Sequence, residues 1–454
     1  MNTSLSIMPV ELALRRQIIF GVWILGLLLL VLFSVFAPLW ALPALFGFAL
    51  LVAAVFVNPY LGSLLMLFLI FSRLLQSLDV GRMFMVAVAL TAVAWVTNMG
   101  FRLDFRINVL KSQTVLILSF IFLLFLSIPF AYDIKLAFTT VLIYLKLLLL
   151  YILFVNLLTT TRRFEWCIYT VLFALLVAVG YGFYTFFIQP SLVARVLRRV
   201  SGGGTDPNFF ALSAVSFLPL PFLFIFEEKK LWRKIFWLTI FLLMIGGILS
   251  SLSRAGILGL AFVLLLLGHK MRKHRVWFWL ATGIILALIF LLPGQLWERM
   301  QTLSSVGRDD SLRWRYKLAV GAWELFWAHP ITGIGVGNFI LFSFRWIDRH
   351  QVAHNTYLEM LAELGVFGLI VFSLLLWITF RYIRESYQSF RKSGQTRMAT
   401  IGEGLEIGFW GFLFVAAFLS LHYEYMFWVF LGFAGALRKI AEKEAPPTLS
   451  AKIS

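Results

Sequence analysis

The sequence predicts an all-α polytopic membrane protein with about 12 to 14 transmembrane helices. Of its 454 residues, 61% are hydrophobic and only 13% are charged. A soluble domain of that composition could not cover its surface with polar groups. Apolar runs of about 18 to 25 residues recur along the whole chain, which is the length that a membrane-spanning helix needs. They lack the alternating pattern of outer-membrane β-strands.

Fourteen candidate spans follow in order, with boundaries accurate to a few residues. The Ala255 and Tyr425 runs are short, and the first two spans are separated closely at Pro38, so twelve spans with two re-entrant or interfacial segments remain an alternative. The first run continues directly into further spans, so no cleavable signal is expected. The spans are Gln17–Ala37, Trp40–Val57, Tyr60–Leu78, Met83–Asn98, Thr114–Ala131, Leu136–Leu158, Phe164–Ile188, Pro207–Phe226, Ile235–Leu252, Ala255–Gly268, Trp277–Leu292, Tyr357–Phe380, Leu405–Leu421 and Tyr425–Leu437.

The distribution of Lys and Arg predicts the orientation. With the N-terminus inside, the inner segments hold 24 cations and the outer segments 14, of which 7 lie in the long segment Pro293–Thr356. The positive-inside rule hardly applies to such a long loop. When the short loops alone are compared, the inner ones hold more Lys and Arg than the outer ones, which favours two cytoplasmic termini. The chain then divides into N-terminal helices (1–188), helices with an Arg- and Gly-rich outer loop (189–292), a large periplasmic loop (293–356) and C-terminal helices with a cytoplasmic tail (357–454).

The net charge of +18 does not indicate a nucleic-acid partner. Cations beside membrane spans normally determine topology, and no aromatic-basic nucleic-acid module is present. Six scattered His and the single Cys167 form no metal-binding spacing, so we expect neither a metal nor another cofactor.

The outer cations differ in kind from the inner ones. Twelve of the 14 outer cations are Arg, whereas the inner side mixes 14 Arg with 10 Lys. A guanidinium is a planar fork of donors that suits phosphate oxygens. The asymmetry therefore indicates a phosphate-bearing ligand on the outer face, with lipid head-group contact as the alternative for any single Arg.

Two short outer segments are candidates for that ligand. In Gln189–Asp206, three arginines precede three adjacent glycines that expose backbone N–H groups. Asp206 would cap the next helix and Pro207 would occupy its first turn, beside Asn208. The three arginines are Arg195, Arg198 and Arg199.

The second segment is the polar break SLSRAG, in which Arg254 lies between two apolar runs. An Arg left in hydrocarbon there costs roughly 2.5 kcal/mol or more. It must snorkel, pair with an acid or face an aqueous cavity, and no carboxylate lies within ten residues. An anionic ligand is the favoured partner, and a remote acid is the alternative.

Inside the long outer loop a helix is predicted over Asp309–Pro330, with a start signal at Asp310-Ser311. An apolar stripe formed by Leu312, Tyr316, Ala319, Trp323 and Phe326 favours a helix lying along the membrane surface, although packing against other spans would give the same stripe. Arg313, Arg315 and Lys317 lie off that stripe.

A glycine-rich turn follows, and Gly335 and Gly337 either allow a ligand to approach the backbone or form a buried tight turn. The spacing is not that of a nucleotide fingerprint. His354 and Asn355 then stand immediately before the next span. A neutral imidazole at this water–membrane boundary, near many arginines, could act as a general base.

Together these motifs resemble the O-antigen ligase and polymerase superfamily. The resemblance lies in TDPNFFAL, SLSRAG, HPITGIGVGNF and AHNTYLEMLAELGVFGL, in that order. It implies a bacterial inner-membrane glycosyltransferase with a GT-C-like fold. Such enzymes transfer a glycan from undecaprenyl pyrophosphate to an acceptor hydroxyl on the periplasmic side, without metal or nucleotide sugar.

The resemblance also implies roles for individual residues. Arg254 and an Arg of the Arg195–Arg199 cluster would bind pyrophosphate, Arg313 or Arg315 would assist, and His354 would be the catalytic or acceptor-orienting residue. Asn355, Asp206, Asn208, Gly335 and Gly337 would support the site. No carboxylate pair at glycosidase spacing is evident, which agrees with an inverting single displacement.

Three functions remain open. The acceptor is a lipid A-core sugar in a ligase, another lipid-linked repeat in a polymerase, and a protein in related members. A transporter for an anionic solute is an alternative of another class, but no internal repeat is evident. Besides a glycosyltransferase and a transporter, the third function that remains open is a lipid flippase.

Overall fold

The computed structural model describes residues 42–72, 80–107, 109–188, 206–270, 283 and 310–444. Within these residues the regular elements are all helices. Eight helical stretches are long and apolar enough to cross a membrane, with Pro207–Glu227 counted as one, and two shorter apolar helices accompany them. Helices satisfy their own backbone hydrogen bonds, as the interior of a bilayer requires. The chain is an all-α polytopic membrane protein, as the sequence predicts.

The helices follow the predicted spans in order. The predicted span Gln17–Ala37 lies outside the described residues, as does Trp277–Leu292 apart from residue 283. The helices are α2 (Leu42–Val57), α3 (Tyr60–Ser72), α4 (Val80–Arg102), α5 (Lys111–Ser127), α6 (Ile134–Leu157), α7 (Thr161–Ile188), α9 (Pro207–Phe217), α10 (Pro219–Glu227), α11 (Leu231–Ser250), α12 (Arg254–Lys270), α15 (Asp310–Ala328), α16 (Phe339–Phe342), α17 (Phe344–Ile347), α18 (Thr356–Lys392), α19 (Thr396–Ala416) and α20 (Tyr425–Glu444).

Several predicted spans differ from the helices observed: α18 continues past Phe380 to Lys392, and α19 begins at Thr396 instead of Leu405. The span Pro207–Phe226 is divided into α9 and α10 at Pro219, which has no N–H to continue the helical hydrogen bonds. The span Leu405–Leu421 ends early, at Ala416, and a loop over residues 417–424 follows. This loop is fastened to the start of α18, where the Thr356 hydroxyl donates to the Leu419 carbonyl and accepts from the Leu421 N–H.

The core of the bundle surrounds α20. This helix packs against α6 and α18, and nearly every residue from Met426 to Ala441 is buried. A helix that is apolar on all sides belongs inside a bundle. Trp428 and Phe433 of α20 pack against rings of α6, with Trp428 beside Tyr144 and Phe433 beside Phe154. The short Tyr425 run is therefore a central helix.

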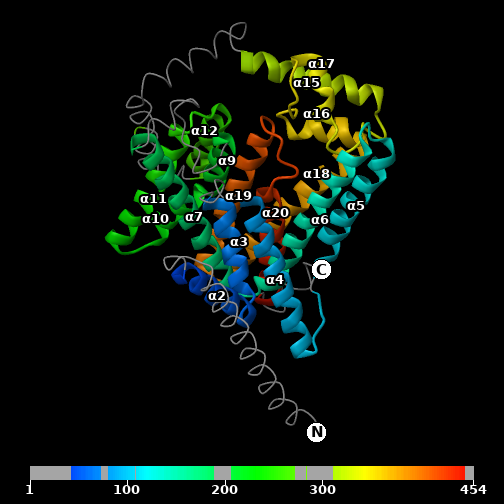
Figure 1. Cartoon of the computed structure of the whole chain (residues 1–454). Coiled ribbons are helices and arrows are strands. Elements are labelled where there is room, and N and C mark those ends of the chain that lie inside the picture. The colour runs from blue at the N-terminus through cyan, green and yellow to red at the C-terminus, as the bar shows by residue number, and fades with distance from the viewer. Residues whose placement is uncertain are drawn as a thin grey trace.

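The helices α15, α16 and α17 gather at one end of the bundle, over the start of α18 (Figure 1). They share a small core with the residues that flank them. That core contains Leu318, Ala322, Leu325, Ile334, Phe339, Ile347, Ala353 and Ala362. We call this assembly the cap.

The predicted apolar stripe of α15 is not the face that the cap buries. Tyr316 is 72% exposed and Trp323 is 48% exposed, whereas Leu318, Ala322 and Leu325 face inward. The stripe is therefore not explained by packing against the described helices. This outcome favours the surface-lying helix, because exposed aromatic side chains suit a membrane interface.

Candidate functional site

His354 lies in the short loop between the cap and α18. Its backbone has φ +53°, a region that residues other than glycine seldom occupy. The His354 N–H donates to the Ser420 hydroxyl at 3.1 Å, and its ring Nε2 lies 3.0 Å from Oε1 of Gln351. These contacts hold the unusual backbone and fix the direction of the imidazole.

The surroundings of His354 keep its imidazole neutral. Burial, followed by the positive charge of Arg315, lowers its pKa to about 4, while the negative charge of Asp206 acts in the opposite direction. At neutral pH the ring can therefore accept a proton. The sequence predicts a neutral imidazole because many arginines lie near it. The structure agrees, but burial lowers the His354 pKa more than Arg315 does.

Asp206 and Asn208 belong to the same corner of the molecule. The Asp206 carboxylate accepts from the Asn208 N–H at 2.8 Å and caps α9, as predicted. The Ser253 hydroxyl donates to Oδ1 of Asn208 at 2.7 Å. This bond joins the TDPN segment to the SLSRAG break, where Arg254 is the first residue of α12 and is partly buried.

Arg313 and Arg315 of α15 have different surroundings. Arg315 is partly buried, and its charge acts on the His354 imidazole. Arg313 is exposed. Of the two alternatives that the sequence leaves open, the geometry favours Arg315. Arg195, Arg198 and Arg199 lie outside the described residues.

The proposed supporting residues have structural roles. Asn355 caps α18, because its Oδ1 accepts from the N–H groups of Tyr357 and Leu358. Gly335 and Gly337 have φ values of +89° and +73°, and a Cβ on them would meet Ala131 and Thr140 respectively. Their backbone therefore lies close to α6 and the turn before it. Of the two interpretations of these glycines, a ligand approach or a buried tight turn, this contact favours the buried tight turn.

The arrangement suits transfer to a hydroxyl. A neutral imidazole, a partly buried guanidinium and a second guanidinium at a helix start come from three separate segments of the chain. Residues 239–373 match the protein-family model Wzy_C, described as O-Antigen ligase. The resemblance to the O-antigen ligase and polymerase superfamily is confirmed. No curated protein matches the chain.

The Wzy_C region runs from α11 into α18 and contains Arg254, Arg313, Arg315 and His354. Asp206 and Asn208 lie before it, and Ser420 lies after it. The match supports a glycosyltransferase-like enzyme of O-antigen processing that works on a lipid-linked glycan in a membrane context.

Two residues behind His354, Glu359 and Ser420, have a role that the sequence did not predict. Oε2 of the buried Glu359 accepts from the Ala353 N–H at 3.1 Å and also from the Ser420 hydroxyl. Glu359 and Ser420 therefore brace the backbone on which His354 stands. The available signal was a glutamate in the first turn of an apolar helix, where a buried carboxylate needs hydrogen-bond donors.

One group of possible metal ligands is present in the described part of the chain. Carboxylate oxygens of Glu359 and Glu363 and a ring nitrogen of His422 lie within 4.8 Å of one another, and all three residues are buried. The oxygens of Glu363 accept from the N–H groups of Gly337 at 2.8 Å and Phe339 at 3.0 Å. Those bonds tie the glycine-rich turn to α18, so the group fits a structural brace.

Proposed function

We propose that the chain is an O-antigen ligase-type glycosyltransferase of the bacterial inner membrane. It takes a glycan from undecaprenyl pyrophosphate and joins it to an acceptor hydroxyl, such as that of a lipid A-core sugar, on the periplasmic face. The observation that carries the proposal is the neutral His354 held beside Arg315 in the corner that also contains Asp206, Asn208 and Arg254.

The chemistry is a single displacement. The acceptor oxygen forms a bond to the anomeric carbon as the bond from that carbon to the pyrophosphate oxygen breaks. His354 takes the hydroxyl proton, and undecaprenyl pyrophosphate leaves with its negative charge. Arg254 and Arg315 stabilise that charge at low dielectric, where the interaction exceeds its value in water. We expect inversion at the anomeric carbon, without a metal.

A transfer assay with purified protein tests this proposal. The donor is undecaprenyl pyrophosphate carrying a glycan, and the acceptor is lipid A-core. Product together with released undecaprenyl pyrophosphate supports a ligase. Donor joined to donor would instead identify a polymerase, and a glycosylated protein acceptor would identify a protein ligase. Unchanged lipid appearing in the other leaflet would contradict the proposal and indicate a flippase.

Two substitutions test the site assignment. His354→Ala and Arg254→Ala should each abolish transfer while leaving insertion and folding intact, with Arg313→Ala as the exposed control in the same region. Arg254→Lys should also be poor, since an ammonium cannot reproduce a two-pronged guanidinium contact with phosphate. Wild-type turnover by His354→Ala or by Arg254→Ala would defeat the assignment.

A further inference from the structure

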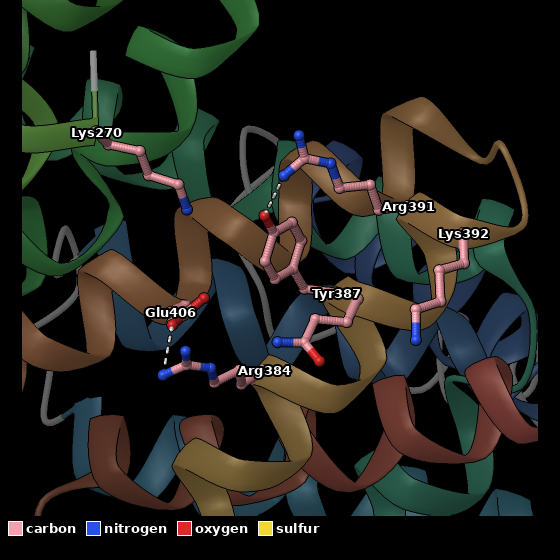
Figure 2. Close-up of a pocket in the computed structure, with 7 residues that line it drawn as sticks. Lys270, Arg384, Tyr387, Arg391, Lys392 and Glu406 are labelled. Carbon is pink, nitrogen blue, oxygen red and sulfur yellow. Dashed lines mark hydrogen bonds and ion pairs between the residues drawn. The ribbon is translucent and has the colours of Figure 1, made fainter. Parts of the chain in front are cut away.

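A pocket lies at the opposite end of α18 from His354. It has a volume of about 450 Å³ and is bounded by the end of α12, the last turns of α18 and the first half of α19. Figure 2 shows four cationic side chains around this hollow, contributed by α12 and α18. The residues that line it are Lys270, Arg384, Tyr387, Gln388, Arg391, Lys392 and Glu406. We call it the basic pocket.

The acids near the basic pocket do not balance its cations. Lys270 pairs with Glu403 at 2.5 Å, and Arg384 lies 4.0 Å from Glu406. Arg391 donates to the uncharged Tyr387 hydroxyl at 2.9 Å and shares the negative charge of Glu403 with Lys270. Among the described residues no carboxylate lies within ion-pair distance of Lys392. The pocket therefore keeps an excess of positive charge.

The ends of helices α12 and α18 account for only part of this charge. The last turn of a helix favours a cation, which explains Lys270, Arg391 and Lys392. Arg384 stands more than two turns before the end of α18, beyond the reach of that effect. It lines the cavity and is about half exposed.

Aromatic residues place the basic pocket at a membrane boundary. The α18 residues between Glu363 and Arg381 carry no charge. Trp377 and Trp410 near the end of that stretch are 54% and 41% exposed. Exposed Trp is typical of the level of lipid head groups. Trp410 packs on Phe380, and the Arg384 guanidinium lies over the same Phe380 ring. The pocket thus begins where the apolar part of the bundle ends.

We propose that the basic pocket binds the phosphate-bearing head group of an anionic phospholipid. Guanidinium groups recognise phosphate oxygens through paired N–H donors, and an ammonium adds a point charge. Arg384 and Arg391 are seven positions apart on α18, which separates them by about 10 Å along the helix axis. Their side chains reach into the same cavity and can surround one phosphate. The acyl chains would lie along the apolar surface that carries Trp377 and Trp410.

Native mass spectrometry of the purified full-length chain tests the proposal. The delipidated protein is titrated with phosphatidylglycerol, with phosphatidylcholine and with soluble glycerol phosphate. The test variant is Arg391→Gln/Lys392→Gln. The matched control is Lys229→Gln/Lys230→Gln, which removes the same charge from two exposed residues in the loop between α10 and α11, outside the pocket.

The proposal expects tighter binding of phosphatidylglycerol than of phosphatidylcholine. It also expects the Arg391→Gln/Lys392→Gln variant to weaken the phosphatidylglycerol complex about tenfold or more, while the control stays close to wild type. Thermal unfolding of both variants should match wild type, because the substituted residues are exposed. Equal weakening in the control would overturn the proposal, as would equal affinity for the two lipids. Glycerol phosphate binding as tightly as the lipid would also overturn it, since a soluble ligand would then suffice.

Discussion

At the residue scale, the site depends on how its surroundings tune one imidazole. Burial and the nearby Arg315 keep His354 neutral at physiological pH, whereas Asp206 limits the depression of its pKa. An imidazole with a pKa of about 4 is a weak base on its own. A bound diphosphate adds negative charge beside it, which raises its pKa toward the working pH. Substrate binding would thus prepare the base.

The pH dependence of transfer tests this tuning. Transfer needs neutral His354, so kcat/KM should fall as pH drops through the pKa of the free protein, about 4. Arg315→Gln removes a positive charge that lowers this pKa, so its acidic limb should move to higher pH. Arg313→Gln, at an exposed position of the same helix, should leave the limb in place. An identical limb in wild type and Arg315→Gln would contradict the role of Arg315.

The contact behind His354 gives a second prediction. Ser420→Ala removes the hydroxyl that accepts from the His354 N–H, and with it the link to Glu359. We expect kcat to fall about tenfold with little change in KM, because imidazole placement matters more than donor binding. Glu359→Gln keeps an acceptor oxygen and should retain more activity than Glu359→Ala. The control Ser386→Ala lies in the second half of α18, where its hydroxyl bonds only its own helix. An equal fall in kcat for Ser386→Ala would show that losing any buried hydroxyl lowers activity, and would contradict the specific role of Ser420.

At the element scale, α18 is the helix that joins the cap to the bundle. Gly365 interrupts it with φ +67°, and the Val366 N–H donates to the Pro330 carbonyl at 2.9 Å instead of bonding within the helix. The Gly335 N–H donates to the Glu363 carbonyl, and the Ile334 N–H donates to that of Ala362. The break in α18 and the glycine-rich turn therefore satisfy each other's backbone groups, as buried polar groups require.

A pair of glycine substitutions isolates this packing. Gly394→Ala adds a Cβ at φ +76° with nothing within 4 Å, so it should cost only about 1–2 kcal/mol of stability for the left-handed backbone. Gly365→Ala has a similar φ, and its Cβ would lie 2.5 Å from the Ile331 carbonyl oxygen. It should therefore lower the thermal unfolding midpoint clearly more than Gly394→Ala. Equal unfolding midpoints for the two variants would show that the contact between the break in α18 and the glycine-rich turn adds nothing to stability.

At the scale of the whole molecule, the two ends of the bundle differ in their charge contacts. At the end of α18, Arg397 pairs with Glu165 at 3.1 Å and Glu227 at 2.7 Å, joining α19 to α7 and α10. Arg438 likewise pairs with Glu385 and Glu442 at that end. At the cap end, Arg345 and Arg349 lie over the rings of Phe342 and Trp314. Among the described residues, these two cap arginines therefore contact aromatic rings, whereas Arg397 and Arg438 at the other end contact carboxylates.

Accessibility of introduced cysteines tests which end faces outward. Cys167 is the only native cysteine and is buried, so its background labelling should be low. Lys317→Cys on α15 should react with a membrane-impermeant maleimide in intact cells. Lys392→Cys at the end of α18 should react only after the membrane is opened. The reverse pattern would place the cap in the cytosol and remove the basis of the proposed function.

The sequence by itself determined the class of fold, the order of the spans and most of their boundaries. Those features follow from local properties: run length, the cap at Asp206 and the glycines that prevent a regular helix. It also singled out Arg254 and His354, because polar residues at the ends of apolar runs are conspicuous. The family resemblance rests on the same local motifs.

Only the tertiary structure decided between residues that look alike in the sequence. Arg313 and Arg315 are equivalent in composition and spacing, yet only Arg315 acts on His354, because the cap packs one face of α15 inward. Ser420 and Glu359 are 61 positions apart, and their contact depends on the loop after α19 folding back on α18. The basic pocket has the same origin, since its cations come from two helices remote in sequence. Side-chain contacts between distant segments are fixed by packing, and local periodicity does not encode them.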